Sequence, residues 1–240
     1  SVTYIYDIFS KKLTEVAPFT VDLLLPSGAE NLNYVLYTDE SPYKMQREWL
    51  DRLPFDIYSV NVHTGAKRLI GRSYRTAPKW SVNGKWAVMY DPIAQVWNKF
   101  DGATGKVVNI SDAIGYPMFM ESYDKPAPAP AYGIAGWTAD GNNVFLYDAY
   151  DWWKIDLTGE RQPECLTKGY GRKHGKSIRK MTSNIDKDVF QKDEKVIVSL
   201  WDKDTMDEGV YQLDMKGRLR KLMEGNYVCL LYTSDAADEL

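Results

Sequence analysis

A short pattern recurs five times along the 240 residues, and this repeat restricts the chain to few folds. Each copy has an aromatic or apolar stretch, then Asp or Asn, then a short polar turn that usually contains Gly. The Asp or Asn positions are 54, 40, 55 and 58 residues apart, at Asp7, Asn61, Asp101, Asp156 and Asp214. Repeats of about this length are typical of four-stranded propeller blades with insertions.

The turn chemistry predicts a β-hairpin at each copy. Gly adopts positive φ in a tight turn at no steric cost, and an Asp or Asn side chain accepts hydrogen bonds from the turn backbone. A second hairpin is predicted at residues 80–91 and 137–148, where Asn-Gly and Asp-Gly separate apolar stretches. Residues 86–90 and 144–147 are apolar at every position, which indicates strands covered on both faces.

Two hairpins make one blade, so we predict an all-β fold, a partial β-propeller of about four and a half four-stranded antiparallel blades. The predicted fragment covers residues 1–228, with a half blade at 1–17 and full blades at 18–71, 72–110, 111–167 and 168–224. We interpret residues 40–54 and 111–135 as insertions. An aromatic content of 13% agrees with a strand-rich fold, because aromatic side chains favour pleated, half-buried surfaces.

The last residues, 229–240, are predicted to be a non-native tail. Residues 229–239 resemble the in-frame translation of a transposase-end sequencing adaptor; the alternative is a genuine strand followed by an acidic turn. The whole chain has a formal charge of −3. Without the tail it has 30 acidic residues and 30 Lys and Arg, so the formal charge becomes zero. Neither balance favours nucleic acid or an anionic membrane as a partner, and no apolar run approaches the ~20 residues of a membrane span.

Three stretches of the chain carry a family resemblance. They are residues 132–138 (YGIAGWT), 147–156 (YDAYDWWKID) and 166–173 (LTKGYGRK). Together they resemble the propeller domain of bacterial prolyl-oligopeptidase-family serine peptidases, including the dipeptidyl-peptidase-like and acylaminoacyl-peptidase-like branches. The resemblance covers roughly residues 55–215.

The resemblance implies a substrate-gating propeller whose partners are the peptide substrate and a C-terminal α/β-hydrolase domain of the same parent chain. In this family the hydrolase domain carries Ser, Asp and His, with the Ser on a G-x-S-x-G turn. The present sequence has no G-x-S-x-G and no paired-Glu stretch like that of dipeptidyl-peptidase relatives. We therefore assign no catalytic residue, cofactor or metal to it, and the peptidase branch stays open.

The resemblance also implies a periplasmic or secreted location. A function of a different class is a non-catalytic propeller that binds a protein partner in the cell envelope. The two hypotheses differ in what the parent gene encodes after residue 228.

Four further patterns favour structural interpretations. Residues 171–177 are one residue short of a phosphate-binding loop, and Ser177-Ile178-Arg179-Lys180 has the S-x-x-K spacing without its partner motifs. The two histidines, His63 and His174, are too few for a zinc site with the available cysteines. The acidic residues 202–209 break the calcium-loop pattern and are interpreted as a solvated turn.

Three residues are predicted to face substrate, Tyr150, Trp152 and Arg172. Tyr150 and Trp152 lie in the aromatic cluster beside Asp148 and Asp151. The alternative is that these aromatic residues form the apolar faces of a blade strand.

Overall fold

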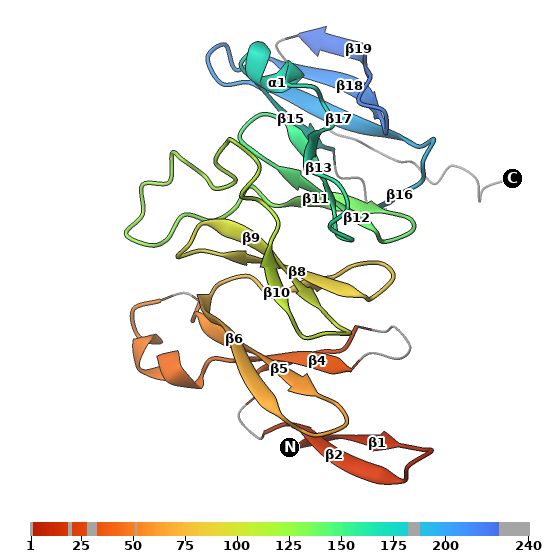
Figure 1. Cartoon of the computed structure of the whole chain (residues 1–240). Helices are drawn as coiled ribbons and strands as arrows, with labels where there is room; N and C mark the ends of the chain where they lie inside the picture. Colours follow the sequence, from red (N-terminus) through yellow and green to blue (C-terminus); the bar gives the residue numbers. More distant parts are fainter. Residues whose placement is uncertain (1, 19–20, 28–32, 51, 182–187, 226–240) are drawn as a thin grey trace, which may run out of the picture. The chain divides into compact units, whose positions relative to one another are not determined.

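The computed structural model describes residues 2–18, 21–27, 33–50, 52–181 and 188–225, and nearly all of its regular structure is β (Figure 1). The chain divides into two compact units, which are described separately. Unit 1 is Ser1–Ala113 with Ser122–Ala131, and unit 2 is Ile114–Glu121 with Tyr132–Leu240. In the described part of the chain, no helix has the length and apolar character needed to cross a membrane.

Unit 1 contains a two-stranded hairpin and two four-stranded antiparallel sheets. The hairpin pairs β1 (Thr3–Asp7) with β2 (Lys12–Ala17). The next sheet has the strands β3 (Leu23–Leu25), β4 (Tyr34–Asp39), β5 (Phe55–Asn61) and β6 (Lys67–Tyr74), in that order. The following sheet has β7 (Lys79–Trp80), β8 (Trp86–Asp91), β9 (Val96–Asp101) and β10 (Val107–Asn109). The insertion between β4 and β5 contains the 3-10 helix η1 (Ser41–Gln46).

Unit 2 contains two further sheets. One has β11 (Ile134–Thr138), β12 (Asn143–Tyr147), β13 (Trp152–Asp156) and β14 (Glu164–Cys165), with the short β16 (Val189–Phe190) added at β11. The other has β15 (Lys176–Lys180), β17 (Lys195–Asp202), β18 (Glu208–Asp214) and β19 (Leu219–Gly225). A single turn of α-helix, α1 (Tyr170–Lys173), joins β14 to β15. The predicted fold class, an all-β partial propeller of about four and a half antiparallel blades, is confirmed.

Asp and Asn side chains shape the turns, as the repeat predicts. Asn61 Oδ1 accepts hydrogen bonds from the backbone N–H groups of His63 and Thr64, both at 3.0 Å. Asp101 does the same for Ala103 and Thr104 at the equivalent turn of the next sheet. The side chain satisfies turn donors that no neighbouring strand reaches, so each third strand ends at its Asp or Asn.

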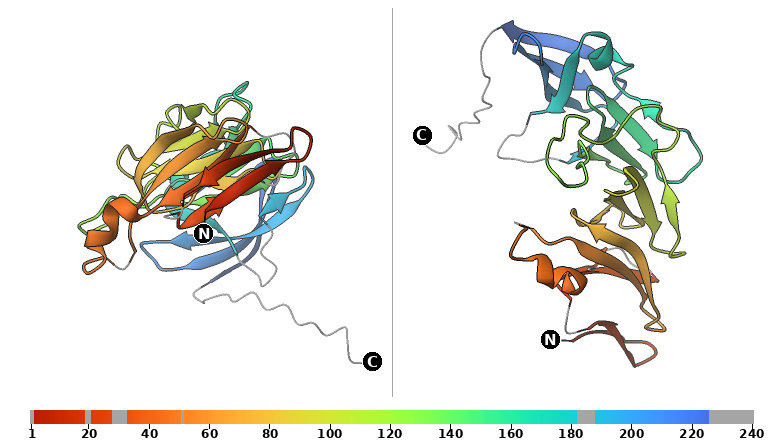
Figure 2. Two further views of the ribbon diagram at one scale, coloured as in Figure 1. Left: turned by 90° about the horizontal axis from the view of Figure 1, so that it is seen from below. Right: turned by 90° about the vertical axis from the view of Figure 1, so that its left-hand side faces the viewer.

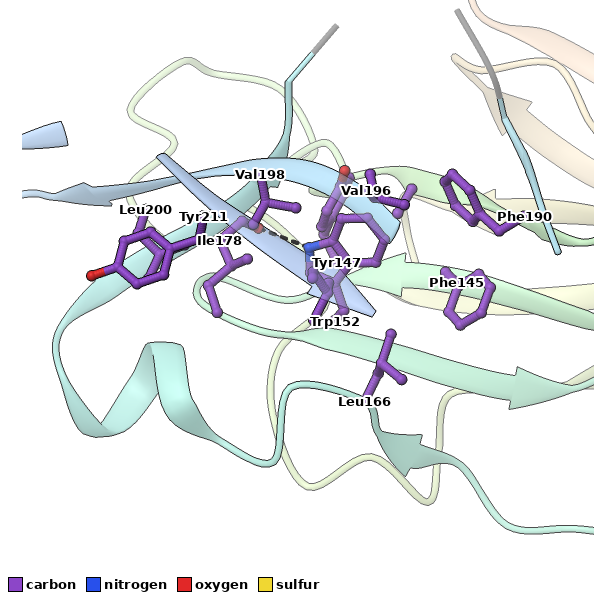
Figure 3. Packing of buried hydrophobic residues seen from close by; sticks show 12 residues of the cluster. Phe145, Tyr147, Trp152, Leu166, Ile178, Phe190, Val196, Val198, Leu200 and Tyr211 are labelled. Carbon is purple, nitrogen blue, oxygen red and sulfur yellow. Dashed lines mark hydrogen bonds between the residues drawn. The ribbon is translucent and has the colours of Figure 1, made fainter. Parts of the chain in front are cut away.

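Apolar side chains fill the space between successive sheets inside each unit. In unit 1, Leu36 and Ile57 of one sheet pack with Met89 and Phe100 of the next. In unit 2, Phe145 and Trp152 pack with strands β15, β17 and β18 (Figure 3). These central strands are buried on both faces, in agreement with their unbroken apolar sequences.

The five-stranded sheet of unit 2 departs from the predicted four strands. Trp137 N donates to Asp188 O at 2.7 Å and Ala139 N to Phe190 O at 3.0 Å, so β16 runs parallel to β11. The Phe190 ring is buried and packs near Phe145 and Trp152. The chain between β15 and β17 thus returns to the preceding sheet, because the exposed edge of β11 offers backbone groups for pairing.

The hairpin β1–β2 corresponds to the outer half of a blade. Asp7 carries the same turn as the other third strands, with its Oδ1 accepting from Phe9 N and Ser10 N. Tyr4 and Tyr6 are about half exposed, at 49% and 55%, whereas Val60 and Phe100 of the matching strands are fully buried. Within the described residues, β1 pairs with β2 alone, so its second edge carries unpaired backbone groups.

The predicted domain bounds stay a prediction, and the tail predicted at 229–240 lies outside the described residues. The insertion predicted at 111–135 contains no strand before β11 begins at Ile134. Its residues 114–121 belong to unit 2, whereas residues 122–131 belong to unit 1.

Substitution of Gly136 tests the pairing of β16. A Cβ at Gly136 would lie 2.5 Å from the Phe190 ring and 2.7 Å from Asp188 O, and the φ of +156° also disfavours a side chain. We expect Gly136→Ala to lower the free energy of unfolding by about 1–3 kcal/mol, measured by urea denaturation. Gly115→Ala is the matched control, because a Cβ there meets nothing within 4 Å, and equal losses in the two variants would contradict the close approach.

Candidate functional site

The carboxylate of Asp148 follows β12 directly and is fully buried in unit 2. Its Oδ1 accepts hydrogen bonds from Tyr150 N and Asp151 N, both at 2.6 Å, and so forms the turn into β13. Its Oδ2 accepts from Trp153 Nε1 at 3.0 Å and from Arg172 Nη2 at 2.9 Å. Four donors compensate the lost hydration of this buried charge.

A second buried carboxylate, Asp151, connects the same turn to α1. Its Oδ1 accepts from Thr167 Oγ1 at 2.6 Å and from Gly171 N at 2.9 Å, and its Oδ2 accepts from Arg172 N at 3.0 Å. A Cβ at Gly171 would lie 2.7 Å from the carbonyl oxygen of Tyr150, so glycine allows the helix to approach the turn. The helical turn is therefore held against the β12–β13 connection by specific hydrogen bonds.

Arg172 is held at both ends by these two aspartates. Asp151 binds its backbone N–H, and Asp148 binds its guanidinium. The guanidinium carbon lies 3.7 Å from the centre of the Tyr116 ring and 5.1 Å from that of Tyr150, within the range of cation–π attraction. Because the side chain stays 31% exposed, Arg172 presents a fixed positive charge to solvent.

An open pocket of about 390 Å³ surrounds this arginine. It is lined by Tyr116, Asp148, Asp151, Trp153, Cys165, Gly169, Arg172 and Lys173. Burial raises the pKa of the Cys165 thiol, and its Sγ accepts a hydrogen bond from Gly169 N at 3.2 Å. A thiol that stays protonated at neutral pH is a poor nucleophile.

The three residues predicted to face substrate have different environments. Arg172 lines the pocket, and the Tyr150 ring is partly exposed, with Lys203 Nζ 5.2 Å from its centre. Trp152 has no exposed surface, and its Nε1 donates to Ile178 O at 3.1 Å inside the core (Figure 3). Its burial supports the alternative that Trp152 belongs to the blade core, whereas peptide contact by Tyr150 and Arg172 stays a prediction.

Sequence reasoning missed Tyr116. This residue lies in the predicted insertion, far along the chain from Arg172, and no local motif marks it as a wall of the pocket. The roles of Asp148 and Asp151 had a partial signal, because both follow an apolar strand where a turn is expected. Their burial and their link to α1 depend on contacts across more than 20 residues of sequence.

A second arginine, Arg179 of β15, also lies beside the β12–β13 turn. Its Nη2 donates to Asp148 O at 2.7 Å and to Ala149 O at 3.1 Å, and its guanidinium lies over the rings of Tyr147 and Tyr132. Burial lowers the pKa of Arg179 from its ordinary value, and the guanidinium stays charged at neutral pH. Arg179 therefore cross-links the turn to the neighbouring sheet.

The other sequence patterns have structural environments. Ser177 of the S-x-x-K pattern lies on a strand, and its Oγ donates to Ala149 O at 2.7 Å. His174 Nδ1 lies 2.8 Å from Tyr170 O, and His63 Nε2 lies 3.2 Å from Asn33 Oδ1. The acidic residues 202–209 span the β17–β18 turn, where Asp202 Oδ1 accepts from Asp204 N and Thr205 N. Among the described residues, no group of three or more His, Cys, Asp or Glu side chains is placed to hold a metal ion.

No protein-family model and no curated protein matches the sequence. Among solved structures, TolB from Acinetobacter baumannii is 11% identical with a TM-score of 0.39, over 93% of this chain and 48% of the TolB chain. An acylaminoacyl peptidase from Pyrococcus horikoshii is 14% identical with a TM-score of 0.41, over 85% of this chain and 32% of the peptidase chain.

Hydrazine synthase from Kuenenia stuttgartiensis is also similar, with 15% identity and a TM-score of 0.38, over 86% of this chain and 49% of the other. The chain thus spans less than half the length of each of these three proteins. Identities and TM-scores this low carry no inference about activity.

The role of Asp148 in fixing Arg172 is testable by removing its charge. We expect Asp148→Asn to lower the free energy of unfolding by about 3 kcal/mol, because a buried ion pair loses one partner. Asp101→Asn is the matched control, since Asn61 already makes the same turn with an amide oxygen, and it is expected to change stability by less than about 1 kcal/mol. Urea denaturation compares the two variants, and equal effects would show that Asp148 is an ordinary turn residue.

Proposed function

We propose that this chain is the substrate-gating propeller part of a serine peptidase of the prolyl-oligopeptidase family. In this proposal the chain binds and admits peptide, and the hydrolysis is carried out by an α/β-hydrolase domain of the same parent protein. The observation that carries the proposal is the Arg172 pocket. Six of its eight lining residues come from two of the three sequence stretches that resemble the family, 147–156 and 166–173. The other two lining residues are Tyr116 and Cys165.

The pocket has the features of a peptide-recognition site. A guanidinium donates hydrogen bonds to peptide carbonyl or carboxylate oxygens, and Arg172 is oriented for this before any ligand arrives. The rings of Tyr116 and Trp153, whose centres are 6.1 Å apart, supply apolar walls. A few fixed polar groups between aromatic walls are the usual composition of a ligand pocket.

The arrangement supports recognition rather than catalysis within the described residues. Acyl transfer by a serine needs its hydroxyl within hydrogen-bond reach of a base, and Ser177 Oγ instead donates to a backbone carbonyl. His174 stacks on Tyr170, with ring centres 4.1 Å apart, and hydrogen-bonds to a backbone oxygen. The proposal accordingly assigns the nucleophile to the hydrolase domain.

Peptide binding by Arg172 is expected to depend on its guanidinium. Fluorescence anisotropy with a fluorescein-labelled Ala-Pro-Phe-Ala-Ala peptide would measure binding to the 240-residue chain. We expect Arg172→Gln to weaken binding at least tenfold, because it removes a charged donor, whereas Arg161→Gln, an exposed arginine outside the pocket, should change it less than twofold. Loss of affinity to the same extent in both variants would contradict recognition at this pocket.

The parent gene distinguishes the peptidase from the alternative, an envelope propeller that binds a protein partner. We expect the gene to continue after codon 228 into a hydrolase domain with G-x-S-x-G, then Asp, then His. Sequencing the genomic locus in both directions is the measurement. A gene that encodes further blades and then stops would favour the non-catalytic propeller.

A further inference from the structure

A second cavity, in unit 1, is lined by three arginines and has no part in the proposed peptidase function. It lies beside the insertion between β4 and β5, which stands out from the sheet in Figures 1 and 2. Its volume is about 650 Å³, and its lining residues are Glu40, Arg47, Leu50, Arg52, Leu53, Phe55, Arg75 and Ala77. We refer to this cavity, defined by these eight residues, as the arginine cleft.

The charge of the arginine cleft is unbalanced. Its lining has three guanidinium groups against one carboxylate, that of Glu40. Arg47 Nη2 lies 3.7 Å from Glu40 Oε2, and the Arg47 side chain is 71% exposed, so this pair is weak and screened by solvent. The side chains of Arg52 and Arg75 are exposed and make no hydrogen bond or ion pair with the described part of the chain. An anion that enters therefore meets two guanidinium groups that no described residue pairs.

The floor of the arginine cleft is apolar and belongs to the core. Leu53 is 7% exposed, and Phe55 packs against the buried cluster that contains Ile57 and Tyr74. Arg75 follows Tyr74, whose side chain is 1% exposed and anchors the end of β6. A ligand side chain that reaches this floor would be removed from water at about 25 cal/mol per Å² of apolar area.

One buried carboxylate fixes the walls relative to each other. Asp56 Oδ1 accepts a hydrogen bond from Tyr43 Oη of η1 at 2.5 Å and another from Ser73 N of β6 at 3.1 Å. The insertion that carries Arg47 and Arg52 is thereby tied to the strand that precedes Arg75. The backbone segments that carry the three arginines are therefore held together before a ligand binds, which lowers the entropy cost of ordering them.

The same insertion exposes two large apolar side chains. Met45 is 85% exposed and Trp49 is 77% exposed, and both belong to the segment that supplies Arg47 and Leu50 to the cleft. Trp, Met and Arg are the residue types enriched at protein–protein interfaces, and Trp and Arg dominate their binding energy. A partner larger than a simple anion would contact these side chains together with the cleft.

We propose that the arginine cleft binds an acidic segment of a protein partner. Carboxylates of the segment pair with Arg52 and Arg75, and an apolar side chain between them packs on Leu53 and Phe55. Guanidinium groups match carboxylates in a two-bond geometry, which favours Asp or Glu side chains as the paired groups. Nucleic acid fits less well, because the floor is apolar and the whole chain carries a formal charge of −3.

A labelled acidic peptide tests the proposal with the 240-residue chain. Fluorescence anisotropy would measure binding of fluorescein-labelled Glu-Phe-Glu-Leu-Glu. We expect the double variant R52Q/R75Q to weaken binding at least tenfold. The matched control is R68Q/R72Q, which removes the same charge from exposed positions of β6 outside the cleft and should weaken binding less than twofold.

Three other probes separate the alternatives. Lys-Phe-Lys-Leu-Lys should not bind, and Glu-Gly-Glu-Gly-Glu should bind at least fivefold more weakly, because it cannot fill the apolar floor. Inorganic phosphate and a uridine oligonucleotide should displace the acidic peptide only at much higher concentrations. The proposal would be overturned if the two double variants lost affinity for the acidic peptide equally, or if Glu-Gly-Glu-Gly-Glu bound as tightly as Glu-Phe-Glu-Leu-Glu. It would also be overturned if phosphate or the oligonucleotide displaced the acidic peptide at concentrations similar to that of the peptide. Urea denaturation of both double variants confirms that they are folded, since exposed Arg→Gln changes alter stability little.

Discussion

Apolar burial between facing sheets is the interaction on which the other features of this protein depend. The central strands are apolar at nearly every position, so each sheet needs a neighbour on both faces. Trp152 alone, with no exposed surface, accounts for a stabilisation of about 3–5 kcal/mol against truncation to Ala. Repetition of one blade satisfies this requirement inside each unit, because neighbouring sheets cover each other's apolar faces.

The same requirement explains where apolar groups are exposed. The hairpin β1–β2 keeps Tyr4 and Tyr6 about half exposed, whereas Val60 and Phe100, which occupy the position of Tyr6 in later strands, are fully buried. Ile5, between them, packs against the buried cluster of Val35 and Val60, whereas Tyr4 and Tyr6 point to the opposite face of the hairpin, which no described sheet covers. The exposed tyrosines therefore follow from the repeat and need no separate functional explanation.

Local chemistry made the turns and strands predictable, whereas contacts between distant segments were not. Asp101 and Asn61 mark their turns because their own side chains bind the next two or three backbone N–H groups. The pairing of β16 with β11 has no such signal, since the steric need for Gly136 arises from Phe190, 54 residues later. For the same reason the sequence indicated Arg172 but not Tyr116, which meets it from an insertion without regular structure.

Strand β16 has a consequence for cooperativity. Its two residues come from the segment between β15 and β17, complete the edge of β11 and bury Phe190 in the shared core. Ile178 N of β15 also donates to Tyr150 O, so hydrogen bonds as well as apolar contacts join the two sheets of unit 2. We therefore expect the two sheets of unit 2 to unfold together rather than one at a time. The β12–β13 turn and α1, which hold Arg172, both belong to unit 2. We therefore expect the pocket to be lost only when the two sheets of unit 2 unfold.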